Sequence, residues 1–170
     1  MHIFLTGNIQ VGKTTIIRRF LSQSGLTADG FMTYWEPDGD GCRSLYLSGY
    51  STDSRPSERY LVARDLGKRV SFAENMAAVF DTQGAKILND SGKRSFIVMD
   101  EIGFMESKAA AFQSAVMRRI SGEIPILGVI KPLQTEFLYA IRVHPNVEVR
   151  EVTTENRDAV LTRLLSQNWR

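Results

Sequence analysis

Residues 2–15 read His-Ile-Phe-Leu-Thr-Gly-Asn-Ile-Gln-Val-Gly-Lys-Thr-Thr, and this stretch decides the fold. The apolar run 2–6 predicts a buried strand, and the apolar positions of residues 13–22 recur at helical spacing. Between them, Gly7–Thr14 fits the spacing G-x-x-x-x-G-K-S/T. A glycine-rich loop that joins a strand to a helix N-terminus points backbone N–H groups at a bound phosphate. The stretch therefore predicts a phosphate-binding loop in an α/β protein.

The predicted loop assigns roles to individual side chains. Lys13 is expected to place its charge on the β- and γ-phosphates of a nucleotide and to act in catalysis, and the Thr14 hydroxyl is expected to coordinate Mg²⁺. Thr15 is expected to face the α-phosphate. The predicted nucleotide contacts are Gly7, Asn8, Ile9, Gln10, Val11, Gly12, Lys13, Thr14 and Thr15.

A second motif lies at residues 96–101, where four apolar residues are followed by Asp100 and Glu101. This is the Walker B pattern, in which the first acid holds the Mg²⁺ shell and the second orients and polarises the attacking water. An acidic pair at a strand end also commonly begins a surface loop. With a phosphate loop in the same chain, we assign the metal role to Asp100 and the catalytic role to Glu101.

The rest of the chain alternates apolar strands with helical patterns. Strands are predicted at 95–99, 124–130 and 147–152, and helices at 107–120, 134–143 and 154–167. Residues 30–35 and 43–47 predict an antiparallel hairpin around the turn 37–41. Residues 49–69 read as a mobile, arginine-bearing loop with a possible short strand at 60–62. The capping-box spacing of Ser71 and Glu74 predicts a helix from residue 71 toward residue 89.

This alternation predicts one α/β domain spanning residues 1–170, with a mainly parallel sheet, helices on both faces and an antiparallel hairpin insertion. The chain has 21 Lys and Arg against 19 Asp and Glu, so its net charge of +2 does not indicate nucleic acid. Cys42 is a lone cysteine, which excludes an internal disulfide. His2 and His144 have no ligand spacing. Without a long apolar run or a leader pattern, we expect a cytoplasmic protein with no membrane partner.

Taken together, the motifs resemble the P-loop nucleoside-triphosphatase family of thermophilic archaea and bacteria, which also has a human member. The resemblance spans the chain and rests on the phosphate loop with its double Thr, Gly30-Phe31 with Thr33, residues 100–103 and 105–106, Leu127-Gly128 and residues 152–157. It implies a RecA-like sheet and Mg²⁺-dependent hydrolysis of nucleoside triphosphates to diphosphates with loose base selectivity.

Two residues depart from the pattern of that family, which usually has Gly where this chain has Gln10 and Lys where it has Phe104. The loss of that Lys leaves open which cation stabilises charge on the γ-phosphate. Lys131 follows a predicted strand, where α/β sheets place ligand contacts, so we predict a catalytic role for it. An arginine of residues 49–69 is the alternative, and Lys131 would then be a solvated surface residue.

Several questions stay open in the sequence. A small-molecule or nucleotide kinase shares the phosphate loop, and residues 49–69 could form its lid, although Glu101 favours activation of water. A nucleotide-dependent switch with an unknown protein partner is a further alternative. Phe31, Tyr34 and Trp35 could stack a base or belong to the core, and Asn156 and Arg157 could approach the base or cap the last helix.

Overall fold

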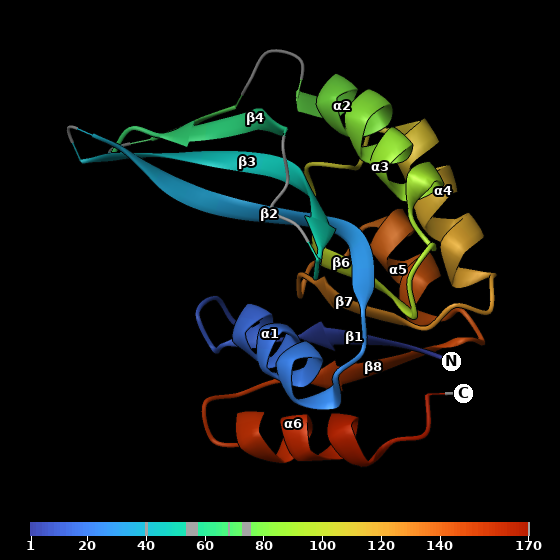
Figure 1. The fold of residues 1–170 in the computed structure, drawn as a ribbon. Coiled ribbons are helices and arrows are strands. Elements are labelled where there is room, and N and C mark those ends of the chain that lie inside the picture. The colour runs from blue at the N-terminus through green and yellow to red at the C-terminus, as the bar shows by residue number, and fades with distance from the viewer. Residues whose placement is uncertain (40, 54–57, 68, 73–75, 170) are drawn as a thin grey trace.

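The computed structural model describes residues 1–39, 41–53, 58–67, 69–72 and 76–169. One eight-stranded sheet, in the order β5-β4-β3-β2-β6-β7-β1-β8, runs through these residues (Figure 1). Its strands are β1 His2–Thr6, β2 Ala28–Gly39, β3 Cys42–Ser51, β4 Arg59–Asp65, β5 Val70–Phe72, β6 Phe96–Ile102, β7 Ile126–Ile130 and β8 Val147–Glu151. β2, β6, β7, β1 and β8 are mutually parallel, whereas β3, β4 and β5 extend the sheet antiparallel from β2.

Helices cover both faces of the sheet, as the sequence predicts. They are α1 Lys13–Ser24, α2 Met76–Val79, α3 Ala85–Asp90, α4 Ala110–Ile120, α5 Glu136–Arg142 and α6 Arg157–Ser166, with a π-helical turn Phe80–Gly84 between α2 and α3. Figure 1 shows α1 and α6 on one face and α3, α4 and α5 on the other. Successive strand residues point to opposite faces, so Ile3 and Leu5 pack with Phe20 under α1, while Phe4 packs with the core under α4 and α5. The predicted α/β fold is confirmed.

The possible short strand at 60–62 is confirmed within residues 49–69, but the prediction of a mobile loop is wrong where the structure describes longer strands in that range. β3 continues to Ser51, and residues 59–65 form β4, which pairs with β3. β4 buries only Val62 and Ala63 completely, so its sequence lacks the apolar alternation that marks a strand. Residues 54–57, which include Arg55, lie outside the described residues.

The helix predicted from residue 71 begins later than expected. Ser71 lies in β5, where it pairs with Arg64 of β4, and Glu74 lies outside the described residues. The described helix begins at Met76 and reaches Asp90 through the π-helical turn. The capping-box spacing is short and local, and here the cross-strand pairing of β5 prevails over it.

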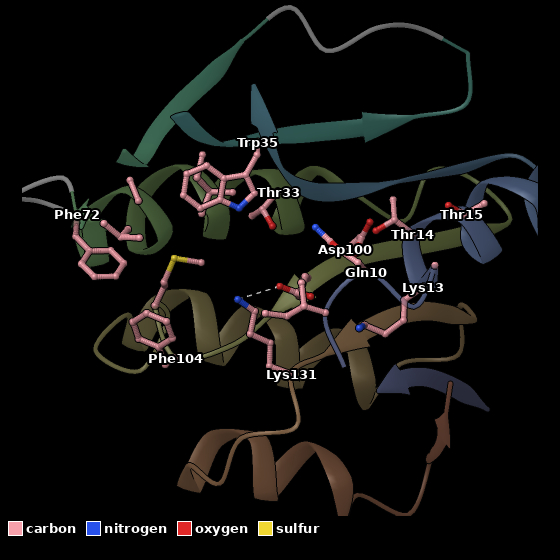
Figure 2. A pocket seen from close by; sticks show the side chains of 17 residues that line it. Gln10, Lys13, Thr14, Thr15, Thr33, Trp35, Phe72, Asp100, Phe104 and Lys131 are labelled. Carbon is pink, nitrogen blue, oxygen red and sulfur yellow. Dashed lines mark ion pairs between the residues drawn. The ribbon is translucent and has the colours of Figure 1, made fainter. Parts of the chain in front are cut away.

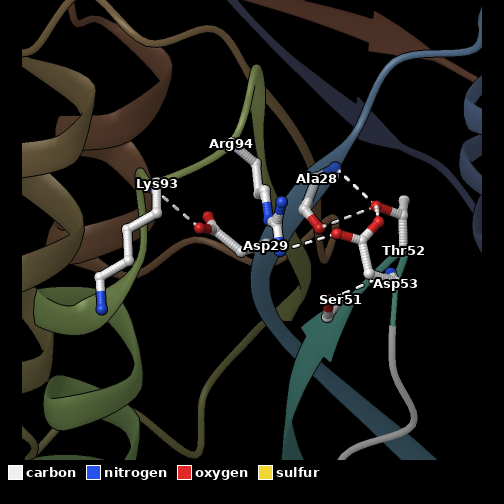
Figure 3. Close-up of polar contacts among 7 residues, drawn as sticks. All are labelled: Ala28, Asp29, Ser51, Thr52, Asp53, Lys93 and Arg94. Carbon is white, nitrogen blue, oxygen red and sulfur yellow. Dashed lines mark hydrogen bonds and ion pairs between the residues drawn. The ribbon is translucent and has the colours of Figure 1, made fainter.

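Polar contacts fix the place where β2 enters the sheet beside β6 (Figure 3). The Asp29 carboxylate accepts hydrogen bonds from the backbone N–H groups of Gly92 and Lys93, at 2.8 and 2.9 Å. Arg94 forms an ion pair of 2.7 Å with Asp53, just past the end of β3. These contacts join the chain before β6 to β2 and β3. They support the register that sets Met32 of β2 opposite Asp100 of β6.

Gly30 lets β2 approach β6 closely. Its φ is +137°, and a Cβ at this position would lie 2.0 Å from the carbonyl oxygen of Val98. A side chain here would push apart the two strands that carry the site, which explains a glycine at this position.

Among the described residues, no helix has both the length and the apolar character that crossing a membrane would require.

Candidate functional site

The loop between β1 and α1 has a backbone that few residue types tolerate. Gly12 caps α1 with a φ of +97°, and a Cβ on Gly7 would lie 2.2 Å from the carbonyl oxygen of Val152. Gln10 also has a positive φ, of 64°. A non-glycine residue adopts this left-handed region at an energetic cost. The glycine that the related family usually has at this position would avoid the backbone strain present at Gln10.

Lys13 spans this loop from the first turn of α1. Its Nζ donates hydrogen bonds to the carbonyl oxygens of Gly7 at 2.9 Å and Asn8 at 2.6 Å. Burial lowers the pKa of Lys13, and the nearby carboxylates of Glu101 and Asp100 partly oppose this. The ammonium group is thus held inside the loop where the motif predicts the β- and γ-phosphates.

Asp100 lies at the floor of the site and is 3% exposed. Burial raises the pKa of its carboxyl group to about 6, although a hydrogen bond with the Thr14 side chain acts in the opposite direction. The sequence predicted that Thr14 and Asp100 share a metal shell, and the structure brings these two side chains together.

The residues at this position suit Mg²⁺. Among the described residues, no three His, Cys, Asp or Glu side chains form a cluster that could hold a metal ion alone. Mg²⁺ bound with a nucleotide commonly takes only one or two protein oxygens, with phosphate and water as its other ligands. A hydroxyl paired with a buried carboxylate provides that donor set.

Glu101 and Lys131 form an ion pair beside Asp100, with 3.1 Å between Lys131 Nζ and Glu101 Oε1. Both side chains are somewhat under one-third exposed, so the pair is open to a ligand. Gly103 makes room for it, because a Cβ there would lie 2.9 Å from Lys131 Cδ. On the far side, the Arg142 guanidinium donates to the carbonyl oxygen of Lys131 at 2.7 Å and holds the turn after β7.

These groups line one cavity of about 520 Å³ (Figure 2). Its polar end contains the loop, the two acids and Lys131, and its other end is formed by aromatic and aliphatic side chains of β2 to β5 and of the segment after β6. The lining residues are Ile9, Gln10, Gly12, Lys13, Thr14, Thr15, Thr33, Trp35, Leu45, Ala63, Val70, Phe72, Asp100, Glu101, Phe104, Met105 and Lys131.

Most residues that the sequence proposed for the site meet in this cavity. Gly7, Asn8 and Val11 are not among its described lining residues: the carbonyl groups of the first two hold Lys13, and Val11 packs into the core. Of the candidate cations, Lys131 lines the cavity.

Two of the arginines that the sequence offers as alternatives to Lys131, Arg59 and Arg64, pair with acids outside the cavity. Arg59 forms an ion pair with Glu36, and its guanidinium lies 4.4 Å from the centre of the Tyr46 ring. Arg64 lies 3.7 Å from Asp38. Among the described residues, the basic side chains that line the cavity are the two lysines.

The structure places several of the aromatic residues and the residues at the start of the last helix. Phe31 is fully buried against Phe112 in the core, whereas Trp35 lines the cavity. The Asn156 side chain accepts from the Thr153 N–H at 2.8 Å and donates to the Glu151 carbonyl at 3.0 Å, so it braces the turn before α6. The side chain of Arg157 passes beside Gly12.

Sequence reasoning missed the apolar half of the cavity and one buried acid. The sequence predicted the hairpin that contains Leu45, but not the pairing of β3 with β4 and of β4 with β5 that brings Ala63 and Phe72 beside it. Glu106 is fully buried: its Oε2 accepts from the Gly103 N–H at 2.9 Å, and its Oε1 has no hydrogen-bond partner in the part of the chain that the structure describes. Burial raises the pKa of Glu106 to about 7.

Glu106 should make stability depend on pH. Its pKa is about 7 in the folded protein against an ordinary 4.5. The folded state therefore keeps a proton that the unfolded state loses, and the free energy of unfolding should fall as pH rises from about 4.5 to about 7. We expect Glu106→Gln to remove the part of this fall that Glu106 causes, while that of Asp100 remains, and to gain about 3 kcal/mol relative to the parent between pH 4 and pH 8. Urea denaturation at intervals across this range measures it.

Glu123 provides the matched control, because it is exposed and Glu123→Gln removes a carboxylate from the surface instead of from the core. That variant should follow the pH dependence of the parent. A Glu106→Gln curve that stays parallel to the parent curve would contradict a buried, proton-holding Glu106.

The strand order, the loop at the N-terminus of α1 and the acid pair on β6 define a P-loop nucleoside-triphosphatase fold. This chain belongs to the nucleoside-triphosphatase family whose model, described as NTPase, matches residues 2–165. The resemblance inferred from the motifs is thereby confirmed.

Among similar proteins, a cancer-related nucleoside-triphosphatase homolog from Bos taurus is 33% identical, over 97% of this chain and 95% of the relative. A nucleoside-triphosphatase THEP1 from Natranaerobius thermophilus is 29% identical, over 96% of this chain and 93% of the relative. The solution structure of a human cancer-related nucleoside triphosphatase matches with a TM-score of 0.69 and 28% identity, covering 98% of this chain and 99% of that one. The crystal structure of THEP1 from Aquifex aeolicus matches in fold, with a TM-score of 0.72 at 23% identity, covering 98% and 100%.

Proposed function

We propose that this chain hydrolyses nucleoside triphosphates to diphosphate and phosphate in a Mg²⁺-dependent reaction with loose base selectivity. One observation carries the proposal: the Glu101–Lys131 pair lines the same cavity as Lys13 and the Thr14–Asp100 pair. The groups that we propose bind phosphate and activate water therefore line one cavity. The relatives are named for nucleoside triphosphates without reference to one base, which supports loose selectivity.

In this proposal the P-loop binds the triphosphate. The N–H groups at the N-terminus of α1 and the Lys13 ammonium bind the β- and γ-phosphates, and Thr15 faces the α-phosphate. Lys13 would exchange its bonds to the Gly7 and Asn8 carbonyls for phosphate oxygens. Because the ammonium already lies within the loop, little side-chain rearrangement is needed.

Thr14 and Asp100 would hold Mg²⁺. When bound, Mg²⁺ supplies positive charge that neutralises the β- and γ-phosphate oxygens. Asp100 must be ionised for this role. Burial makes the charged form costly without a cation beside it, so the carboxylate favours the entry of one.

Glu101 is proposed to act as the general base. Its carboxylate accepts a proton from water as the water oxygen attacks the γ-phosphorus and the bond to the β,γ-bridging oxygen breaks. Lys131 is within reach of the same place and would stabilise charge on the γ-phosphoryl oxygens. The single domain 1–170 would carry the whole reaction, in the cytoplasm, with the nucleotide as its partner.

A phosphate-release assay with ATP, GTP, CTP and UTP tests the proposal. We expect all four to release phosphate at comparable kcat/KM without any added acceptor, and we expect EDTA to abolish release. Release from one nucleotide only would contradict loose selectivity, and full activity in EDTA would contradict the metal dependence.

The matched variants for the metal assignment are Thr14→Ala, which removes the hydroxyl oxygen, and Asp100→Asn, which removes the negative charge and one carboxylate oxygen. The Mg²⁺ concentration that gives half-maximal activity should rise in both variants. An unchanged Mg²⁺ response in either one removes that residue from the metal shell.

A further inference from the structure

The apolar half of the cavity is built from a row of side chains across four strands. Trp35 of β2 pairs with Leu45 of β3, Leu45 with Ala63 of β4, and Ala63 with Phe72 of β5. Residues directly opposite one another in a sheet point to the same face, so this row forms one wall. All four residues line the cavity.

The opposite wall comes from the segment that follows β6. Phe104 and Met105 lie there, and the Phe104 ring meets the Phe72 ring edge to face with 5.6 Å between their centres. We name this region the aromatic arm, defined by Trp35, Leu45, Ala63, Phe72, Phe104 and Met105.

Three rings of the arm are unusually exposed for aromatic side chains that lie together. Trp35 is 40% exposed, Phe72 44% and Phe104 41%. Exposed apolar side chains that gather in a hollow, rather than scatter over the surface, mark a ligand site.

The arm lies at the γ-phosphate end of the site. In Figure 2 the Phe72 and Phe104 rings lie beyond Lys131, on the side away from Thr15. Thr15 marks the α-phosphate end, from which the nucleoside continues, while Glu101 and Lys131 mark the γ-phosphate end. The aromatic arm therefore extends away from the side of the site where the nucleoside is expected.

The side chains of the arm select for a neutral, flat ligand. None of its six residues is ionisable, and the nearest charges in the cavity are Glu101 and Lys131 at its entrance. Ala63 is the smallest residue of the row, and it lines the cavity between Leu45 and Phe72. Rings stack well on aromatic walls of this kind.

We propose that the aromatic arm binds a second substrate, a small planar aromatic alcohol whose hydroxyl faces Glu101 and accepts the γ-phosphoryl group. The proposal rests on the proposed function only for the phosphate end of the site. The alcohol oxygen forms a bond to the γ-phosphorus, the bond to the β,γ-bridging oxygen breaks, and the hydroxyl proton passes to the Glu101 carboxylate. The products are a phosphate monoester and the nucleoside diphosphate, and water takes the place of the alcohol when the arm is empty.

The binding test uses 2-naphthalenemethanol as the probe and isothermal titration calorimetry of the full chain, with and without Mg²⁺ and a non-hydrolysable ATP analogue. We expect saturable binding that persists when the analogue is bound. Phe72→Ala removes a ring and Ala63→Leu adds bulk to the cavity wall, so each should weaken binding about tenfold or more. Tyr139→Ala removes an exposed ring outside the cavity and should bind the probe as the parent does.

The transfer test follows naphthylmethyl phosphate by ³¹P NMR in the presence of Mg²⁺ and ATP. We expect the ester to form in step with ADP in the parent, and Glu101→Gln to lower its formation. Phe72 is partly exposed, so Phe72→Ala keeps the test valid even if Ala63→Leu fails to fold.

Four results would overturn the proposal: no saturable binding, equal binding by Phe72→Ala and the parent, displacement of the probe by the ATP analogue, or binding without ester formation. Displacement would assign the arm to the nucleotide. Failure of the proposed hydrolysis would give a different result from failure of alcohol transfer, because phosphate release from ATP would then be absent even without any alcohol.

Discussion

Glu101→Gln should lower steady-state phosphate release by about 10²–10⁴-fold, the usual contribution of a positioned general base. Glutamine keeps the size and hydrogen-bonding ability of the side chain but does not take a proton from water. Affinity for Mg²⁺-ATP should stay within about a few-fold of the parent, because the lost interaction matters mainly in the transition state. Phosphate release and titration with a fluorescent ATP analogue measure the two quantities separately.

The matched variant for this experiment is Lys131→Met, which removes the ion-pair partner of Glu101 but keeps the carboxylate. It should lower kcat more than affinity if Lys131 stabilises charge on the γ-phosphoryl group. Full turnover in Glu101→Gln would assign the water to another group. A loss of affinity equal to the loss of turnover would mean that Glu101 shapes the site instead of activating water.

Lys13→Ala should lower triphosphate affinity by about 10²-fold or more, because hydrogen bonds to charged groups contribute about 1.5–3 kcal/mol each and we propose that the ammonium group contacts two phosphates. The fold should survive, since the side chain bonds only to carbonyl oxygens of its own loop, which water can reach once the side chain is gone. Titration with a fluorescent ATP analogue and a thermal unfolding curve test both statements.

Lys108→Ala is the control for charge alone, because Lys108 is exposed and does not line the cavity. It should bind ATP as the parent does. If Lys13→Ala also retained parent affinity, the loop would not be a phosphate site.

Sequence reasoning predicted the parts of the fold in which consecutive residues carry both the secondary-structure pattern and the site residues. The strand at 2–6, the loop and α1 follow one another directly, and the apolar run of β6 ends in its two acids. Lys131 was predicted from a rule about strand ends, and the structure places it 3.1 Å from Glu101.

The missed parts depend on contacts between distant segments. β4 buries two adjacent residues and β5 is a three-residue exposed strand, so neither shows an alternating apolar pattern. Their strand character comes from the pairing of β4 with β3 and of β5 with β4. The aromatic arm exists only once that pairing sets Ala63 beside Leu45 and Phe72. The spacing of residues along the chain does not predict which side chains become neighbours across paired strands. Glu106 was part of a recognised motif, but its complete burial depends on the packing around it.

The continuity of the sheet from β6 through β2 to β5 has a consequence for how this molecule can change over evolution. The backbone bonds that place Met32 opposite Asp100 also fix where Trp35, Leu45 and Ala63 stand relative to the acids. Replacing side chains along that row changes the shape of the hollow without moving the carboxylates. Substitutions on β3 to β5 can therefore change which shapes this half of the cavity accommodates, while Asp100 and Glu101 keep their places on β6.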